Sequence, residues 1–349
     1  MFKEKTYSHS MFTIRKIGIL VSIFFSFFFL APAFAEANEG PPVERHHFSL
    51  SPLLGMFYGQ AEELVFRPGS DRLLSELLWD LKPLFYVGLA AEFGPRDPFQ
   101  DNGFIAAASI KFGLPFRSGN HENRDWLNPQ HGRLTHFSQH DVYTQNAILL
   151  DISAGYSWRL TDTLALRAHV AFSFMHFSWS GENGFIQYPT NIAGEILGTT
   201  APPWSSDLPK IPLHGMVIRY SQNWFIFAPG ISFTWRGDHR FSMEGSFSYS
   251  PLIFCAARDD HLLRRITFFD YMSFGHFFNG GGSFVFAARD NLDIAFSVFY
   301  RYITGTRGRT YQQNNVTGRT YLTTNDGAGA GFSALTVGLA ARIRLIGRN

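Results

Sequence analysis

An acidic residue and a histidine stand two positions apart, at Asp259 and His261, in the segment 258–267 (RDDHLLRRIT). Alternate residues of an extended chain project to the same side, so the two side chains would be neighbours if this segment is a strand. A carboxylate beside an imidazole fixes its tautomer and raises its basicity, which suits a general base that activates water. The alternative is a surface loop in which the spacing is fortuitous.

A second pair with the same spacing is Asn123 and Asp125, in the segment 119–126 (GNHENRDW). On an extended chain these side chains also share one face, where they could hold a water molecule from the side opposite the general base. The alternative is an Asx-rich turn, because Asn and Asp side chains readily hydrogen-bond nearby backbone groups. The two pairs could therefore bind one water molecule between them, with one pair activating it and the other holding it in place.

Histidines elsewhere raise the question of a metal site. The candidate ligand pairs are His46 with His47, His121 with Glu122, and His136 with His140. None of these pairs adds a third ligand at a spacing typical of zinc sites. The sequence therefore predicts neither a metal nor another cofactor.

The elements that carry these residues alternate between apolar and small or polar side chains with period two, which is typical of β-strands. In 148–160 the even positions hold Ile, Leu, Ala, Tyr and Trp, whereas the odd positions from 151 onward hold Asp, Ser, Gly and Arg. The small, polar face suits a narrow, packed lumen better than bulk water. An apolar outer face and a small, polar inner face are typical of a transmembrane β-barrel.

Counting the alternating stretches predicts an all-β, ten-stranded antiparallel barrel, and single-chain bacterial barrels have even strand numbers. The predicted strands are 48–66, 75–94, 103–116, 143–160, 164–187, 214–236, 240–257, 265–287, 292–303 and 329–347. Short turns fit the periplasmic end, and longer polar segments fit extracellular loops at 67–74, 117–142, 188–213, 258–264 and 304–328. Several strands exceed the 9 to 11 residues that cross the hydrocarbon layer, so the barrel should extend beyond the membrane.

The N-terminus has the composition of an export signal. Residues 17–35 form an apolar run that follows Arg15 and Lys16 and ends in Ala33-Phe34-Ala35, as in a secretory signal peptide. We therefore expect a signal peptide at 1–35 and one outer-membrane barrel domain at 36–349; the alternative is a retained N-terminal anchor.

Composition narrows the function classes further. Aromatic residues make up 17% of the 349-residue chain, which excludes a disordered chain, and the single cysteine, Cys255, excludes an intramolecular disulfide. Residues 1–35 contain four basic residues and one acidic residue, so their removal changes the net charge from +2 to −1. Without a basic excess the chain is not expected to bind nucleic acid.

Four segments together resemble the omptin family of outer-membrane endopeptidases. Segment 119–126 resembles the family block G-N-x-x-D-x-D-W, and segment 258–267 resembles D-E-H followed by R-I-T. Segment 54–66 (LGMFYGQAEELVF) resembles the first strand of the family, and segment 134–141 (LTHFSQHD) partly matches at Ser138 and His140. The resemblance implies a ten-stranded barrel with an active-site groove on its extracellular rim.

The resemblance also implies roles for individual residues. The catalytic Asp/His dyad of the family falls on Asp259 and His261, and its second carboxylate pair falls on Asn123 and Asp125. His261 would deprotonate a water that Asp125 helps to position, and that water would attack a peptide carbonyl without a covalent intermediate. A family acid that lines the pocket for a basic substrate side chain matches Glu63.

Three departures from the family pattern affect these expectations. Asn123 replaces an aspartate, so a negative charge is lost beside the water. Ala257 replaces the second acid of the specificity pocket, which leaves Glu63 alone and should weaken the preference for Arg or Lys. The outward basic positions that contact lipopolysaccharide in the family fall on His176 and Asn223, which makes dependence on that lipid doubtful.

We therefore predict an omptin-like endopeptidase of reduced activity or altered specificity in the bacterial outer membrane. Its active site would face the extracellular side and act on polypeptides at the cell surface, with outer-membrane lipid, including lipopolysaccharide, as a further partner. The alternative is a non-catalytic barrel, an adhesin or structural protein on the same scaffold, because Asn123 stands in a catalytic position.

Overall fold

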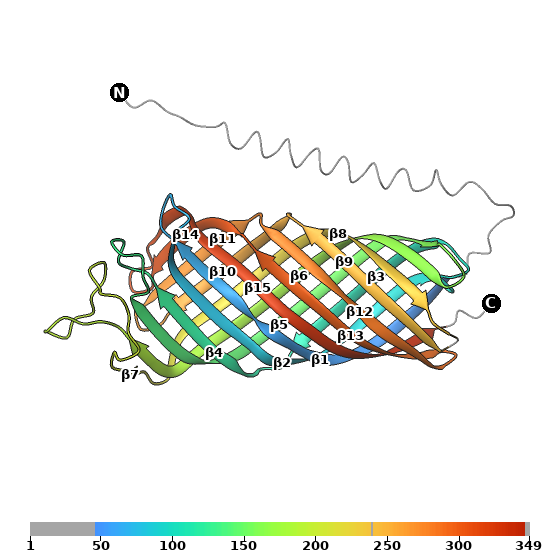
Figure 1. The fold of residues 1–349 in the computed structure, drawn as a ribbon, viewed down its shortest axis with the longest axis horizontal. Coiled ribbons are helices and arrows are strands. Elements are labelled where there is room, and N and C mark those ends of the chain that lie inside the picture. Colours follow the sequence, from blue (N-terminus) through green and yellow to red (C-terminus); the bar gives the residue numbers. More distant parts are fainter. Residues whose placement is uncertain (1–45, 239, 346–349) are drawn as a thin grey trace, which may run out of the picture. The chain divides into compact units, whose positions relative to one another are not determined.

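The computed structural model describes residues 46–238 and 240–345, and the predicted signal peptide lies outside them. The described residues form fifteen β-strands (Figure 1). They are β1 (His46–Phe66), β2 (Leu73–Pro95), β3 (Gly103–Gly113), β4 (Phe116–Asp125), β5 (His136–Arg159), β6 (Leu164–Gln187), β7 (Ile211–Pro212), β8 (Met216–Arg236), β9 (Phe241–Ser250), β10 (Ile253–His261), β11 (Ile266–Ser273), β12 (His276–Arg289), β13 (Leu292–Thr304), β14 (Arg307–Asn314) and β15 (Thr320–Leu345). Among the described residues, no helix is long and apolar enough to cross a membrane.

Antiparallel pairing closes these strands into a ring. One half of the barrel is ringed by β1, β2, β3, β5, β6, β8, β9, β12, β13 and β15, and β15 pairs with β1. In the other half β4, β10, β11 and β14 replace β3, β9, β12 and β13 in the same circuit. Ten strands therefore surround the lumen of the described barrel at either level, which confirms the predicted all-β, ten-stranded fold.

Three of the ten predicted strands are each interrupted once, and a fourth break follows the predicted strand 292–303. The breaks fall between β3 and β4, β9 and β10, β11 and β12, and β13 and β14. Proline, which has no N–H to donate to a ladder, lies at the first two breaks as Pro115 and Pro251. Gly275 and Gly305 lie at the other two with φ of 157° and 74°, values that favour glycine.

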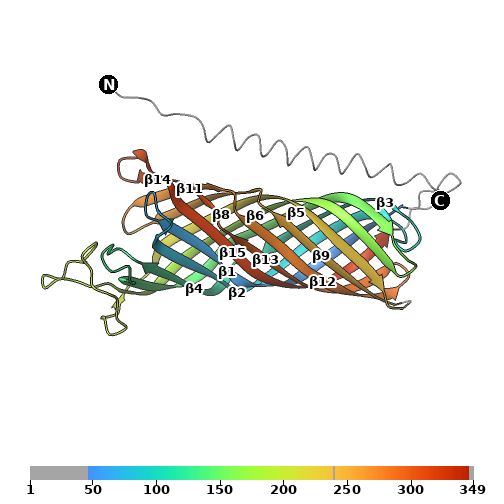
Figure 2. The same cartoon turned by 45° about the horizontal axis from the view of Figure 1, so that its top comes forward.

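The two ends of the barrel differ in their connections, as Figures 1 and 2 show. We call the end with the short connections 96–102, 160–163 and 290–291 the turn end, and the other the loop end. Strands at the loop end are longer than predicted: β4, the start of β5, the end of β10, β14 and the start of β15 occupy segments expected to be loops. The loop interpretation of 117–142, 258–264 and 304–328 is thus largely wrong. These rims lack a lipid-facing apolar side, so the alternation that revealed the other strands is missing.

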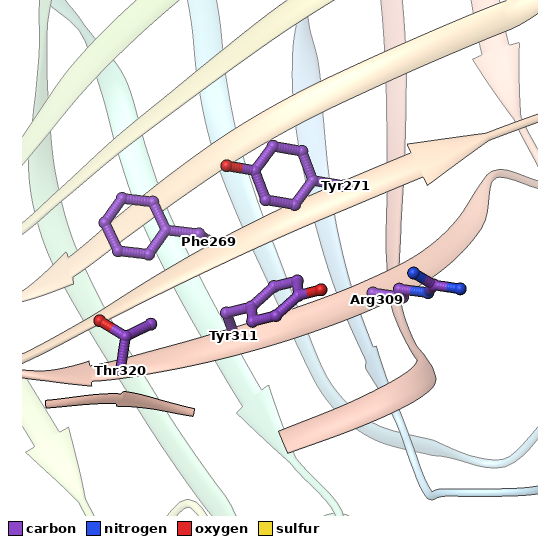
Figure 3. Close-up of a pocket in the computed structure, with 5 residues that line it drawn as sticks. All are labelled: Phe269, Tyr271, Arg309, Tyr311 and Thr320. Carbon is purple, nitrogen blue, oxygen red and sulfur yellow. The ribbon is translucent and has the colours of Figure 1, made fainter. Parts of the chain in front are cut away.

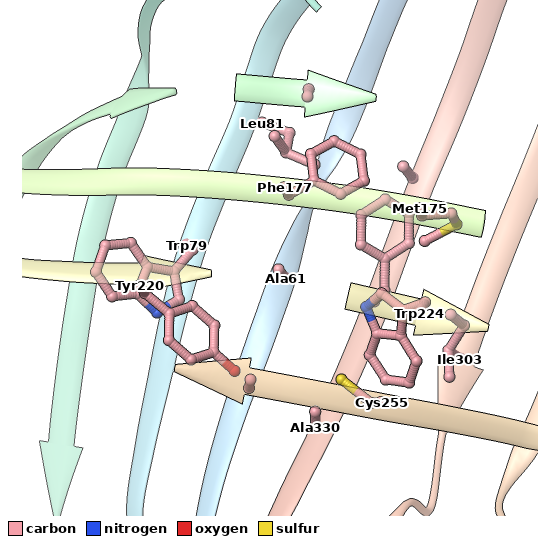
Figure 4. Close-up of a cluster of buried hydrophobic side chains, with 14 of the residues drawn as sticks. Ala61, Trp79, Leu81, Met175, Phe177, Tyr220, Trp224, Cys255, Ile303 and Ala330 are labelled. Carbon is pink, nitrogen blue, oxygen red and sulfur yellow. The ribbon is translucent and has the colours of Figure 1, made fainter. Parts of the chain in front are cut away.

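The lumen also differs from the small, polar interior that was expected. Large aromatic side chains fill it towards the loop end, and six are fully buried: Trp79, Phe177, Trp179, Tyr220, Trp224 and Phe332. Trp79 stacks on Tyr220 with ring centroids 5.3 Å apart, and Cys255 is buried in the same cluster (Figure 4). This cluster forms a solid floor beneath the loop-end rim, where the candidate catalytic residues lie.

Candidate active site

The predicted dyad is formed at the end of β10. His261 Nε2 lies 2.6 Å from Asp259 Oδ2, and the aspartate is almost fully buried while the imidazole is 21% exposed. Phe268 packs edge-on against the imidazole, with ring centroids 5.4 Å apart. Because Nε2–H donates to the carboxylate, Nδ1 keeps the lone pair with which the imidazole can accept a proton.

The second pair lies on β4, at the last rungs of its ladders with β2 and β5. Ser75 Oγ donates to Asp125 Oδ1 over 2.5 Å, and Asn123 Nδ2 donates to Asp125 Oδ2 over 3.4 Å. Burial raises the pKa of Asp125 to about 6, although the Ser75 hydrogen bond and the charges of His261 and Arg264 act in the opposite direction. Asp125 therefore loses its proton close to neutrality.

The barrel brings these two pairs within electrostatic range of each other. Asp125 on β4 and His261 on β10 interact across the lumen, because the charge of His261 lowers the pKa of Asp125. Both are the last residues of their strands at the loop end, well beyond the part of a strand that crosses hydrocarbon. An acid and a base thus face each other at a rim that water can reach.

Asn123 is oriented by a residue that sequence reasoning missed. Tyr188, just after β6, hydrogen-bonds with both Asn123 and Ser138. Burial, together with the charge of Asp125, raises the pKa of Tyr188 to about 12, so its hydroxyl keeps its proton. Tyr188 lies 65 residues from Asn123 in sequence, and no spacing rule could have joined them.

The partial match at Ser138 and His140 does not produce a Ser/His pair. The His140 imidazole donates through Nδ1 to the carbonyl oxygen of Asn183 over 2.5 Å and stacks on His121 at 5.7 Å. Ser138 instead hydrogen-bonds with Tyr188. The serine therefore supports the water-holding side of the site.

Glu63 is fully buried and lies close to the dyad aspartate. Burial, and the negative charges of Asp259 and Asp270, raise the pKa of Glu63 well above its usual range. Glu63 and Asp259 can also share a hydrogen bond when one of them is protonated. The expectation that Glu63 stands alone is wrong, because Asp270 on β11 is a second acid beside it.

Other features lie apart from this site. His176 and Asn223, the positions matched to the family's lipid contacts, hydrogen-bond each other over 2.8 Å on β6 and β8. A pocket of about 380 Å³ lies between the side chains of Phe269, Tyr271, Arg309, Tyr311 and Thr320 (Figure 3). Phe269 and Tyr271 flank Asp270 on β11 and project to the opposite face, so this pocket is separate from the acids. Within 46–238 and 240–345, no group of three His, Cys, Asp or Glu side chains is arranged to hold a metal ion.

Comparison of the whole chain with known proteins identifies its family and its fold. The family model for the omptins matches residues 44–343. The chain belongs to the omptin family. The chain is 23% identical to the plasminogen activator of Yersinia pestis over 239 residues, which are 67% of this chain and 69% of the relative. The crystal structure of the outer membrane protease OmpT from Escherichia coli superposes with a TM-score of 0.74 at 17% identity, over 89% of this chain and 99% of the other. The resemblance found in the sequence is thereby confirmed, as an outer-membrane protease family with this fold.

Proposed function

We propose that this omptin is a peptide hydrolase that uses a water activated between His261 and Asp125. The observation that carries the proposal is the 2.6 Å contact of Asp259 with His261, formed across the lumen from Asp125. His261 Nδ1 takes a proton from the water, whose oxygen bonds to the carbonyl carbon of the peptide. The C–N bond then breaks, and the proton on His261 passes to the leaving amine. No residue becomes covalently attached to the substrate.

Asp125 and Asn123 hold this water from the other side in the proposed mechanism. Asn123 donates its amide N–H to Asp125, and its Oδ1 is buried without a hydrogen-bond partner in the described part of the chain. That oxygen is free to accept a hydrogen bond from the water but cannot take up its proton. We therefore expect slower turnover than an aspartate at this position would give.

The location and partners in this proposal follow from the family. The loop end would face the outside of the cell after export with removal of residues 1–35, and substrates would be polypeptides at the cell surface. A contact with lipopolysaccharide would involve a different chemistry from that of the family, because His176 and Asn223 are hydrogen-bonded to each other. A non-catalytic barrel is the second candidate, and the neutral Asn123 beside Asp125 is the observation that favours it.

Cleavage of peptides by cells that display the protein separates the two candidates. Peptides with basic or neutral residues at the cleavage site are incubated with wild type, His261→Ala and Asn123→Asp. We expect activity in wild type, its loss in His261→Ala and a gain in Asn123→Asp. Equal inertness of wild type and His261→Ala, with no activity regained in Asn123→Asp, would favour the non-catalytic barrel.

A further inference from the structure

An acid stands directly across the β10–β11 ladder from the position at which the family acid is missing. Ala257 on β10 pairs with Asp270 on β11 in the antiparallel register. Residues paired in this way project from the same face of a sheet, with Cβ atoms about 4.5–5.5 Å apart. Asp270 therefore occupies the space beside Ala257 on the lumen side.

Asp270 is buried, and among the described residues one of its carboxylate oxygens lacks a hydrogen-bond donor. Its side chain is only 6% exposed, and Thr310 of β14 supplies a hydrogen bond. Its Oδ1 has no hydrogen-bond partner within the described residues. A buried carboxylate oxygen without a donor destabilises the folded protein unless a ligand completes it.

Glu63 is also buried with one carboxylate oxygen that lacks a donor in the described part of the chain, and it interacts electrostatically with Asp270. Glu63 is 4% exposed, and its Oε2 is likewise without a partner in the described ranges. The negative charge of Asp270 adds to that of Asp259 in opposing ionisation of Glu63. Within the described ranges, no arginine or lysine side chain offsets this repulsion at Glu63 or Asp270. Two carboxyl groups therefore converge on one buried spot that lacks a positive charge.

One ladder neighbour of each acid is an alanine. Ala257 lies beside Asp270, and Ala330 of β15 lies opposite Glu63. A guanidinium or ammonium group at this spot would supply both the positive charge and the N–H donors that the acids lack.

We propose that Asp270 is a specificity-determining residue, which together with Glu63 binds the basic side chain of the substrate residue next to the cleaved bond. This inference rests on the proposed peptidase function. It replaces the expectation that Ala257 weakens the preference for Arg or Lys: the second acid is present, but it is supplied by β11 instead of β10.

The competing role for Asp270 is purely structural, as an acid that stays protonated and hydrogen-bonded with Thr310. The two roles differ in what they do to substrate choice. A structural acid affects all substrates alike through folding, whereas a specificity residue changes the ratio of kcat/KM for basic and neutral peptides.

The test uses two peptides that differ only in Arg or Gln at the cleavage site, with the full-length protein in detergent and its folded fraction measured. The variants are Asp270→Asn, Asp270→Ser, and Asp270→Asn combined with Ala257→Asp. Asp260→Asn is the matched control, because Asp260 projects to the outer face of β10, where it pairs with Arg258.

We expect Asp270→Asn and Asp270→Ser to lower the Arg/Gln ratio of kcat/KM by about 10- to 100-fold, the size of one charge-assisted hydrogen bond. Adding Ala257→Asp should restore most of the ratio by placing the acid across the ladder, and Asp260→Asn should leave it unchanged. An active wild type whose ratio is the same in both Asp270 variants overturns this inference alone. A wild type that cleaves neither peptide, at a full folded fraction, overturns the proposed function and this inference with it.

Discussion

The barrel holds two groups of inward carboxylates, which differ in whether an arginine or lysine forms an ion pair with them. Towards the turn end, inward acids are paired with cations: Asp151 lies 3.0 Å from Arg301 and 3.6 Å from Lys111, and Glu244 accepts two hydrogen bonds from Arg342 at 2.9 and 3.2 Å. At the loop end Glu63, Asp259 and Asp270 are buried and Asp125 is half-buried. Within the described ranges no arginine or lysine forms an ion pair with any of the four, although the charge of Arg264 acts on Asp125.

This difference separates structural charges from functional ones. Buried ions are tolerated when each is paired and hydrogen-bonded, as in the turn-end half of the lumen. Acids that form no ion pair with an arginine or lysine weaken the fold, and such arrangements are concentrated at functional sites. The aromatic cluster beneath the loop-end acids separates the two groups. Substitutions should therefore affect activity at one end of the barrel and stability at the other.

The largest expected effect is that of Asp259→Asn at the loop end. The amide no longer stabilises the protonated imidazole of His261, so kcat/KM should fall by about 10²- to 10⁴-fold. Unfolding of the barrel on heating in detergent should be unchanged or delayed, because a buried negative charge beside Glu63 is removed. A loss of activity that follows a loss of folded protein would contradict this assignment.

Arg301→Met, towards the turn end, should lower the stability of the barrel and leave its activity unchanged. It leaves Asp151 buried with Lys111 as its remaining cation, which should lower the free energy of unfolding by about 3 kcal/mol. The kcat/KM of the folded fraction should stay at the wild-type value. Urea titration of protein in lipid vesicles, with peptide cleavage measured on the same samples, checks both parts. Intact stability with impaired cleavage would mean that the two groups of charges are not independent.

The pH dependence of cleavage should reflect the protonation of Asp125 at the loop end. The pKa of Asp125 is raised to about 6, so the carboxylate is protonated below that pH, and kcat/KM should fall about tenfold per pH unit there. The Ser75 hydrogen bond lowers this pKa, so Ser75→Ala should shift the acidic limb to higher pH. Cleavage of one peptide between pH 4 and 8 measures the limb in both proteins. A limb at the same pH in Ser75→Ala would mean that another group controls it.

The fold could be predicted from the sequence because a lipid-facing wall constrains every second residue. The alternation in 148–160 and similar stretches was sufficient to count ten strands. It failed where lipid no longer applies the constraint: β4 and the start of β5 are strands whose rims carry polar residues on both faces. It also could not foresee that Trp79 and Tyr220, far apart in sequence, would fill the lumen together.

The candidate site also contains residues that could be predicted from the sequence and residues that could not. Asp259 with His261, and Asn123 with Asp125, could be found because their side chains share a face within one strand. Asp270 and Tyr188 could not, since their contacts depend on the register between strands and on a segment that returns over the rim. Contacts across a ladder follow no spacing in the sequence.

The smallest expected effect concerns Tyr188, which touches the site only through Asn123 and Ser138. Tyr188→Phe keeps the ring and removes the hydroxyl that orients the Asn123 amide, so kcat/KM should fall by about 3- to 10-fold, the size of one neutral hydrogen bond. Tyr321→Phe, at an exposed position of β15, is the matched control and should cleave at the wild-type rate. The decisive comparison is with Asn123→Asp, because a carboxylate at 123 has no N–H to donate to the Tyr188 oxygen and would instead accept a hydrogen bond from the Tyr188 hydroxyl. If Tyr188→Phe has the same effect whether residue 123 is Asn or Asp, the hydroxyl does not act through that side chain.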